Sequence, residues 1–150
     1  MDDERNPAPF SVPPNLEPSL ARVRNYWLGL RRGQADIPFK DDVSLSALSL
    51  AGVDLLLVDV FERPSRFRIA IAEPGIAARY GQAVEGIFAD EIVPQAPLDY
   101  FLSQCSACAE GRAPTYYRSN PPSSYARLLL PLWGDGHINA LLGAVSYDGS

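Results

Sequence analysis

The chain has 150 residues, of which 47% are hydrophobic and 21% charged, and its formal net charge is −5. Length and composition are those of one globular domain, and the acidic balance argues against nucleic-acid binding, which normally needs a basic face. Since no apolar run approaches the roughly 20 residues of a membrane-spanning helix, we expect no nucleic-acid and no membrane partner.

The beginning of the chain and its cysteines bear on the compartment. The chain begins Met-Asp-Asp-Glu-Arg, which is acidic where an export signal is basic, and no apolar segment follows. The two cysteines, Cys105 and Cys108, do not make a disulfide framework, which agrees with a reducing environment. We therefore expect a cytoplasmic protein.

Proline is dense at the start of the chain, where five of the 14 prolines lie within the first 18 residues. Proline fixes φ and lacks an amide donor, so neither a helix nor a central strand is expected there. Residues 1–19 are therefore predicted to form a flexible or polyproline-like arm, and residues 20–150 the folded domain. A docking peptide for a partner is the alternative interpretation of the arm.

The first predicted helix covers residues 20–32, with Ser19 as its N-cap and Gly33 as the residue that ends it. Its apolar residues recur at three- and four-residue steps, which predicts an amphipathic helix. The residues of this stripe are Leu20, Val23, Trp27 and Leu30. Such a stripe can cover the core of its own domain or pair with a second subunit, and we expect a homodimer through these residues.

A hairpin and a helical middle follow. A short helix is expected over residues 44–50. Residues 54–61 and 66–71 are rich in β-branched and apolar residues, the second run alternates strictly, and a short turn joins them, which is typical of a hairpin. A longer helix is predicted over residues 98–109, and Gly111 ends it.

The last third of the chain predicts three more strands, over residues 115–118, 125–133 and 138–147. A Gly-Asp-Gly turn joins the last two, which is a strong hairpin signal. Tight turns within both groups of strands favour an antiparallel sheet. We therefore expect an α+β fold, in which five antiparallel strands carry short helices on one face and follow an N-terminal amphipathic helix.

Several short segments carry a family resemblance. They are residues 26–33 (Tyr-Trp-Leu-Gly-Leu-Arg-Arg-Gly), 57–60 (Leu-Val-Asp-Val), 67–69 (Phe-Arg-Ile), 81–86 (Gly-Gln-Ala-Val-Glu-Gly), 128–132 (Leu-Leu-Leu-Pro-Leu) and 141–143 (Leu-Leu-Gly). In this order and spacing, and with two strands, short helices, a longer helix and three strands, the chain resembles a bacterial branch of small stand-alone PAS sensor proteins. The resemblance covers about residues 20 to 148. The chain departs from this branch at residues 72–74 and 84–86, which edge the usual PAS cavity.

PAS relatives bind ligands between the sheet and its short helices, so the resemblance implies an apolar cavity there. The strand residues predicted to face it are Leu56, Val58 and Val60, Phe67, Ile69 and Ile71, and Leu128, Leu130 and Leu132. The predicted ligand-binding residues are Val58, Phe67, Ile69, Phe88, Tyr100, Phe101, Cys105 and Leu130. The alternative is that these side chains fill the core at normal density.

Side chains that could carry catalysis are few and isolated. His137 is the one histidine of the chain, so a multi-histidine metal site is excluded, and no nucleophile-elbow motif accompanies it. Cys105 and Cys108 have C-x-x-C spacing, but predicted helix precedes them, so they lack the help of a helix N-terminus in lowering their pKa. We interpret both cysteines as small buried residues, with a thiol redox sensor as the alternative.

The function implied by the resemblance is a non-catalytic PAS-type signalling domain. It would bind a small ligand, a partner protein or both, and pass its output through protein–protein contact. The helix over residues 20–32 and the proline-rich arm are the expected contact surfaces for an unidentified signalling protein. A ligand-free interaction module with a filled core is the alternative, and the sequence identifies no cofactor.

Overall fold

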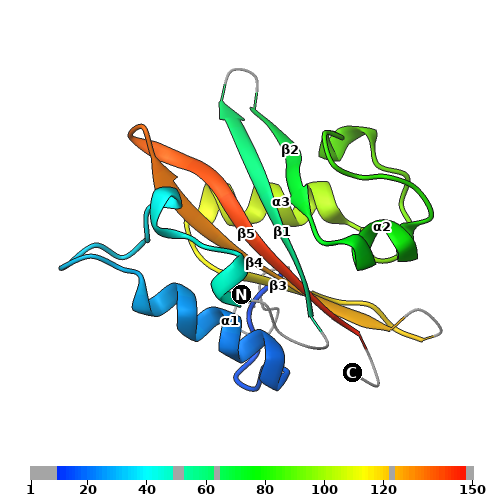
Figure 1. Ribbon diagram of the computed structural model, residues 1–150, viewed down its shortest axis with the longest axis horizontal. Coiled ribbons are helices and arrows are strands. Elements are labelled where there is room, and N and C mark those ends of the chain that lie inside the picture. Colours follow the sequence, from blue (N-terminus) through cyan, green and yellow to red (C-terminus); the bar gives the residue numbers. More distant parts are fainter. Residues whose placement is uncertain (1–9, 49–52, 63–64, 122–123, 148–150) are drawn as a thin grey trace, which may run out of the picture.

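The computed structural model describes residues 10–48, 53–62, 65–121 and 124–147 and has an α+β fold with one five-stranded antiparallel sheet (Figure 1). The strands are β1 (Val53–Glu62), β2 (Ser65–Ala72), β3 (Thr115–Arg118), β4 (Tyr125–Gly134) and β5 (His137–Tyr147). The helices in this part of the chain are α1 (Pro18–Gly29), α2 (Pro74–Tyr80) and α3 (Phe101–Gly111). Short 3₁₀ turns form η2 (Lys40–Asp42), η3 (Ser46–Leu48) and η4 (Ala89–Glu91).

The strands lie side by side in the order β2-β1-β5-β4-β3. The chain leaves one edge of the sheet after β2, passes through α2, η4 and α3, and returns at the opposite edge as β3 (Figure 1). All five predicted strands are confirmed. Turn chemistry explains why their ends were predictable: Asp135 and Gly136 both have positive φ, as a two-residue hairpin turn requires.

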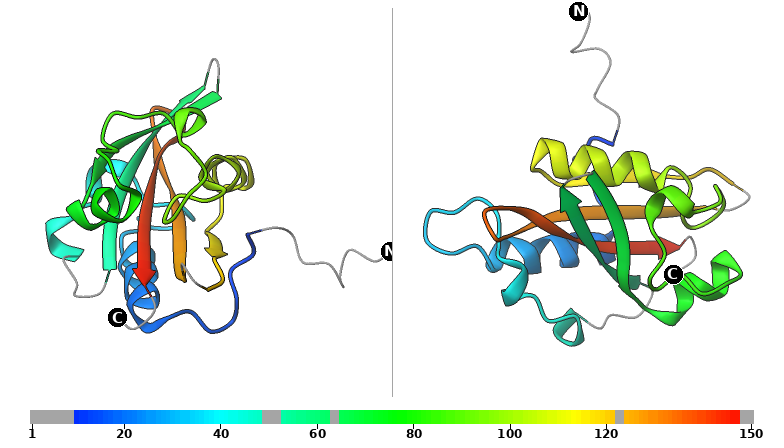
Figure 2. Two further views of the ribbon diagram at one scale, coloured as in Figure 1. Left: turned by 90° about the vertical axis from the view of Figure 1, so that its right-hand side faces the viewer. Right: turned by 90° about the horizontal axis from the view of Figure 1, so that it is seen from above.

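Helices cover both faces of the sheet. The short helices of the middle segment lie on one face, as predicted, whereas α1 lies on the other (Figure 2 shows α3 and α1 on opposite sides of β4). We name the two sides the α3 face and the α1 face. No helix within the described ranges is long and apolar enough to span a membrane.

The α3 face holds the larger core. Leu56, Val58 and Val60 of β1 point into it, as predicted, and meet side chains of α2 and α3. From β4, however, Leu129 contributes to this core, while its neighbours on either side point away. Successive side chains of a strand point to opposite faces. The sequence therefore predicted which side chains of β4 share a face, but not which of the two faces each set occupies.

The α1 face holds the second core, and it corrects two expectations. Leu128, Leu130 and Leu132 of β4 lie here rather than facing the helical middle. The stripe of α1 packs onto the same strands: Leu20, Val23 and Trp27 are buried, and Leu30 is half-buried. Trp27 Nε1 also donates a 2.8 Å hydrogen bond to the Pro131 carbonyl. The stripe therefore covers the chain's own core and is not a free dimer surface.

The ends of α1 differ from the prediction. Pro18 is the first helical residue, which suits its missing amide hydrogen, and Glu17 rather than Ser19 is the N-cap. The helix ends at Gly29, and Gly33 lies in the following loop. Of the short helix expected over residues 44–50, a 3₁₀ turn is present at Ser46–Leu48, and residues 49–50 lie outside the described residues.

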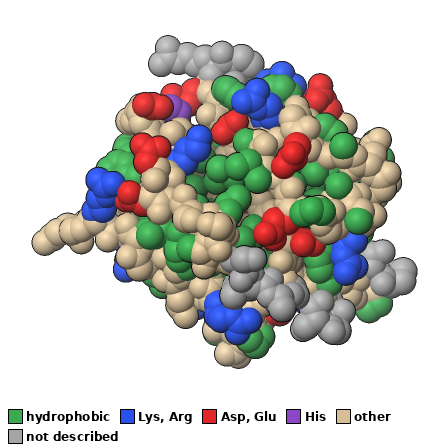
Figure 3. Space-filling view, in the orientation of Figure 1, with side chains coloured by type: hydrophobic (Ala, Val, Ile, Leu, Met, Phe, Trp, Pro, Cys, Tyr) green, Lys and Arg blue, Asp and Glu red, His purple; other side chains and the backbone are tan. Residues whose placement is uncertain are grey.

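A bulge in β2 reverses the direction of its last side chains. Leu57 pairs with Ile71 but the next residue of β1, Val58, pairs with Ile69, so Ala70 is the extra residue. Phe67 and Ile69 are buried as predicted, whereas Ile71 is 44% exposed on the α1 face. Hydrophobic side chains gather near the middle of the face shown in Figure 3, among charged ones, where β1 and β2 have no helix over them.

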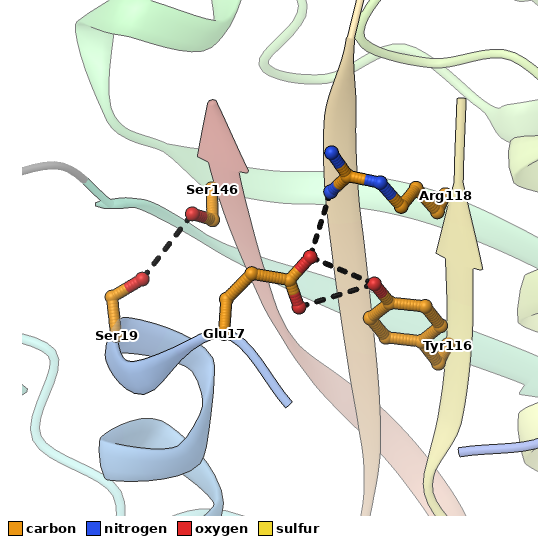
Figure 4. A network of polar contacts seen from close by, with 5 residues as sticks. All are labelled: Glu17, Ser19, Tyr116, Arg118 and Ser146. Carbon is orange, nitrogen blue, oxygen red and sulfur yellow. Dashed lines mark hydrogen bonds and ion pairs between the residues drawn. The ribbon is translucent and has the colours of Figure 1, made fainter. Parts of the chain in front are cut away.

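The second half of the predicted arm is packed against the sheet. The Phe10 carbonyl accepts a 2.9 Å hydrogen bond from the Tyr116 amide of the edge strand β3, and Val12 and Leu16 lie against the core of the α1 face. Glu17 accepts hydrogen bonds from Tyr116 and Arg118 (Figure 4). The first half of the arm, residues 1–9, lies outside the described residues.

Candidate functional site

Five of the eight predicted ligand-binding residues lie together, and three lie elsewhere. Val58, Phe67, Ile69, Phe101 and Cys105 come together and are buried in the core of the α3 face. That core is therefore made of the side chains that were expected to line a cavity.

The other three residues lie elsewhere. Leu130 is on the α1 face, on the opposite side of the sheet, and so lines no common cavity with the first group. Phe88 is half-buried at the edge of β2, where the Arg66 guanidinium lies 3.7 Å from its ring centre. Tyr100 is 65% exposed at the start of α3.

Beside Phe101, a surface pocket of about 220 Å³ opens between η4 and the start of α3. Its lining is mostly apolar and consists of Ala89, Asp90, Ile92, Pro94, Leu98, Tyr100, Phe101, Leu102 and Ser103. Two of its large hydrophobic side chains, Tyr100 and Leu102, are exposed, and so is that of the neighbouring Val93. Asp90 is already engaged by Arg66 at 2.9 Å. The pocket is thus suited to a small apolar group.

The register of α3 explains this exposure. The helix begins at Phe101 rather than at residue 98, and its buried side carries Phe101, Gln104, Cys105 and Cys108. Leu102, which follows Phe101, lies off this buried side and is 40% exposed. The polar Gln104 takes the inward position because its side chain has specific partners there.

Those partners centre on Arg127, a fully buried residue of β4 that the sequence analysis did not single out. Its guanidinium donates hydrogen bonds to Gln104 Oε1 at 2.7 Å, the Pro97 carbonyl at 2.9 Å and the Asp99 carbonyl at 2.7 Å. Burial lowers the pKa of the guanidinium. Arginine is rarely buried unless it is paired, and here it ties the segment before α3 to the sheet.

A second contact fixes the same segment. Tyr125 donates a 2.8 Å hydrogen bond to the Asp99 carboxylate and accepts one from the Asp99 amide at 3.1 Å. The chain directly after this anchor is Tyr100, which has a positive φ of 56°. Phe101 then returns to the core, where its ring centre lies 5.2 Å from the Arg127 guanidinium. The wall of the pocket is therefore fixed to the sheet through Asp99, whereas the Tyr100 side chain beside it is exposed to solvent.

Two residues of the sequence carried a signal for this site. Arg127 stands in an otherwise apolar strand, residues 125–133, and a charged residue at an inward position of a strand needs partners. Gln104 offered a weaker signal, as the polar member of a helical stripe. Neither signal identifies the partner atoms, because two of them are backbone carbonyls of a loop.

The two cysteines are buried in the core of the α3 face. Burial raises the pKa of both thiols, and that of Cys108 reaches about 12. Cys108 Sγ donates a 3.5 Å hydrogen bond to the Leu129 carbonyl. Because the thiolate is the reactive form of cysteine, this environment opposes redox chemistry and favours the interpretation of both residues as core.

His137 lies at another surface pocket of about 270 Å³, at the far end of α3. Its lining includes Glu62, Glu110 and Arg112. His137 Nδ1 is 3.9 Å from Glu62 Oε1. Within the described ranges, no three His, Cys, Asp or Glu residues are placed to hold a metal ion.

No protein-family model matches the chain, and no curated protein matches it. A function for the chain must therefore be inferred from the chemistry of the described residues. The pocket beside α3 is apolar, and its one charged group, Asp90, is paired with Arg66. Such a pocket holds a ligand or side chain by burial of apolar surface.

Proposed function

We propose that the chain is a PAS-type sensory domain without catalytic activity, which binds a small ligand or a partner side chain in the pocket beside α3. The order of elements supports this proposal, since two strands, short helices, a longer helix and three strands are what the resemblance implies. Output passes to a partner protein by surface contact. The cytoplasmic location expected from the cysteines belongs to the same proposal.

The observation that carries the proposal is the gathering of exposed apolar side chains at this pocket. Val93 is 54% exposed, and Tyr100 and Leu102 flank the opening. Exposed apolar side chains around a concavity mark binding sites more often than isolated ones do. Because Arg127 and Tyr125 hold the adjoining segment, the pocket is largely preformed, which lowers the cost of ordering on binding.

The test uses indole as an apolar probe of single-side-chain size. An NMR titration of the full chain is expected to shift the amide signals of residues 89–92 and 100–103. Leu102→Asp places a charge at the wall of the pocket and should weaken binding about tenfold or more. Ile71→Asp is the matched control, since Ile71 is equally exposed but lies on the α1 face.

Three results would contradict the proposal: no binding of indole, shifts spread over the whole surface, or equal loss of binding in both variants. Native mass spectrometry of the freshly purified protein complements the titration, because it detects a retained small molecule and counts subunits.

The second candidate is an interaction module with a filled core. It is favoured by the burial of Val58, Phe67, Ile69 and Cys105 against one another, where a ligand cavity was expected. Under this candidate the pocket accepts only a partner side chain, and no small molecule is retained on purification.

A further inference from the structure

Residues 10–17 wrap around the edge of the sheet, and we call this segment the strap. Phe10 contacts Tyr117, whose side chain belongs to the α3 face. The Phe10 carbonyl accepts a hydrogen bond from the Tyr116 amide at the edge of β3. Val12 and Leu16 then pack against the core of the α1 face. The strap therefore touches both faces.

One end of the strap is latched by Glu17 (Figure 4). Its carboxylate lies 2.8 Å from the Tyr116 hydroxyl and 2.7 Å from Arg118 Nη1. Burial and the nearby carboxylate raise the pKa of Tyr116 to about 12. Glu17 is also the N-cap of α1, and Ser19 in the first turn donates a 3.3 Å hydrogen bond to Ser146 of β5. A displacement of the strap would thus move Glu17 and change the contacts at the start of α1.

The other end of the strap is connected to the pocket by aromatic rings. The ring centre of Tyr117 lies 6.4 Å from that of Phe10 and 5.6 Å from that of Tyr100, which lines the pocket. These distances are typical of interacting aromatic pairs. Tyr117 is held in turn by Tyr125 and by the Arg127 guanidinium, at 5.9 Å and 5.1 Å.

The backbone at both outer rings is strained. Phe10 has a φ of 70° and Tyr100 a φ of 56°. Bulky residues rarely adopt positive φ, and they do so where the surroundings hold them. A rearrangement that returns φ of either residue to the negative range would relieve this strain, which offsets part of the free energy of a lost ring contact. Such a segment has an alternative state within reach of a modest free energy.

We infer that the strap is a releasable element whose seating on β3 is linked, through Tyr117, to the position of Tyr100 in the pocket. This inference rests on the proposed function in taking the pocket as the ligand site. A group in the pocket that prefers one position of Tyr100 changes the contact of Phe10, and a change at the strap alters affinity in the pocket by the same factor. The strap thereby couples ligand binding on the α3 face to the contacts at the start of α1.

The test measures hydrogen exchange of the Tyr116 amide by NMR in the full chain without ligand. This amide donates to the Phe10 carbonyl and so reports the seating of the strap. Tyr100→Ala is expected to speed its exchange roughly 2- to 10-fold, as expected for loss of one aromatic contact. Leu102→Ala is the matched control, because Leu102 is also exposed and lines the pocket but is not aromatic and so is no member of this series of rings.

Further variants act on the strap directly. Phe10→Ala should speed exchange of the Tyr116 amide at least as much as Tyr100→Ala, and Glu17→Gln should do so by weakening the latch. The Tyr117 residue pairs with Arg127 inside the sheet, so its amide is the internal reference for global opening.

Unchanged exchange of the Tyr116 amide in Tyr100→Ala, or an equal change in Leu102→Ala, overturns the inference whatever the pocket binds. If the strap responds as expected but indole does not bind, the link between Tyr100 and the strap is supported and the proposed function fails. If indole binds and exchange of the Tyr116 amide does not change in Tyr100→Ala, the proposed function is supported and the link between Tyr100 and the strap fails.

Discussion

The two faces of the sheet are stabilised in different ways. The α1 face is built almost entirely from aliphatic side chains and Trp27, which pack a helix onto β4 and β5. The α3 face contains more apolar residues but also buries Arg127, Gln104 and Thr115. Apolar packing tolerates changes that conserve volume, whereas a buried polar network demands particular atoms in particular places. The face whose buried polar atoms must lie in particular places is therefore the one that shapes the pocket.

Replacement of Trp27 by Ala is the strongest test of the α1 face. It removes a buried aromatic ring and the hydrogen bond to the Pro131 carbonyl, and we expect the free energy of unfolding to fall by about 4 kcal/mol. Urea denaturation measures the loss, with exposed Asn25→Ala as the control on the same helix. A loss that vanishes at low protein concentration would instead place Trp27 at a subunit interface.

Replacement of Arg127 by Met breaks the network of the α3 face. The Pro97 and Asp99 carbonyls and Gln104 Oε1 lose their donor, and we expect a loss of roughly 3 kcal/mol. NMR signals of residues 97–103 should shift while those of α1 stay in place. Exposed Arg22→Met controls for the loss of a positive charge. Equal stability of the two variants would show that the network is dispensable.

The thiols of the α3 face give the third test. Because burial raises the pKa of Cys105 and Cys108, the native protein should react with a disulfide reagent at pH 8 at least about 100-fold more slowly than the unfolded chain. The unfolded thiols ionise near pH 9.0, so the thiols' contribution to stability is complete below that pH. For Cys108 it is lost as the pH rises toward about 12. Rapid reaction of the native protein would revive the redox alternative.

The sequence predicted the elements of the fold well, but it predicted the sides they face correctly for β1 and the first part of β2 and not for β4. Strand ends were predictable because turns such as Asp135–Gly136 have distinctive chemistry. The direction of β4 was not, because both of its faces are buried and its leucines look alike from either side. The exposure of Ile71 depends on the bulge at Ala70, a backbone irregularity without a clear signal in a single sequence.

The candidate site was only partly predictable. Tyr100 and Phe101 were expected at a ligand site and both line the pocket. Leu102 and Ser103 add a part of α3 to the lining, and the other lining residues belong to the loop and turn over residues 89–98, which have no periodic pattern. Arg127 was overlooked because its partners include carbonyl groups of that loop, and backbone acceptors are the same at every residue.

The proline in β4 has a consequence for association. The Ser119 amide donates to the Tyr125 carbonyl, so alternate residues of β4 from Tyr125 onward turn their backbone groups toward β3. Pro131 is one of them, but it has no partner in β3, because β3 begins at Thr115, opposite Leu129. It offers no amide there, its carbonyl is taken by Trp27, and the Trp133 amide donates to the Pro38 carbonyl. A foreign strand finds no ready backbone partner at these positions, so contacts made there rely on side chains.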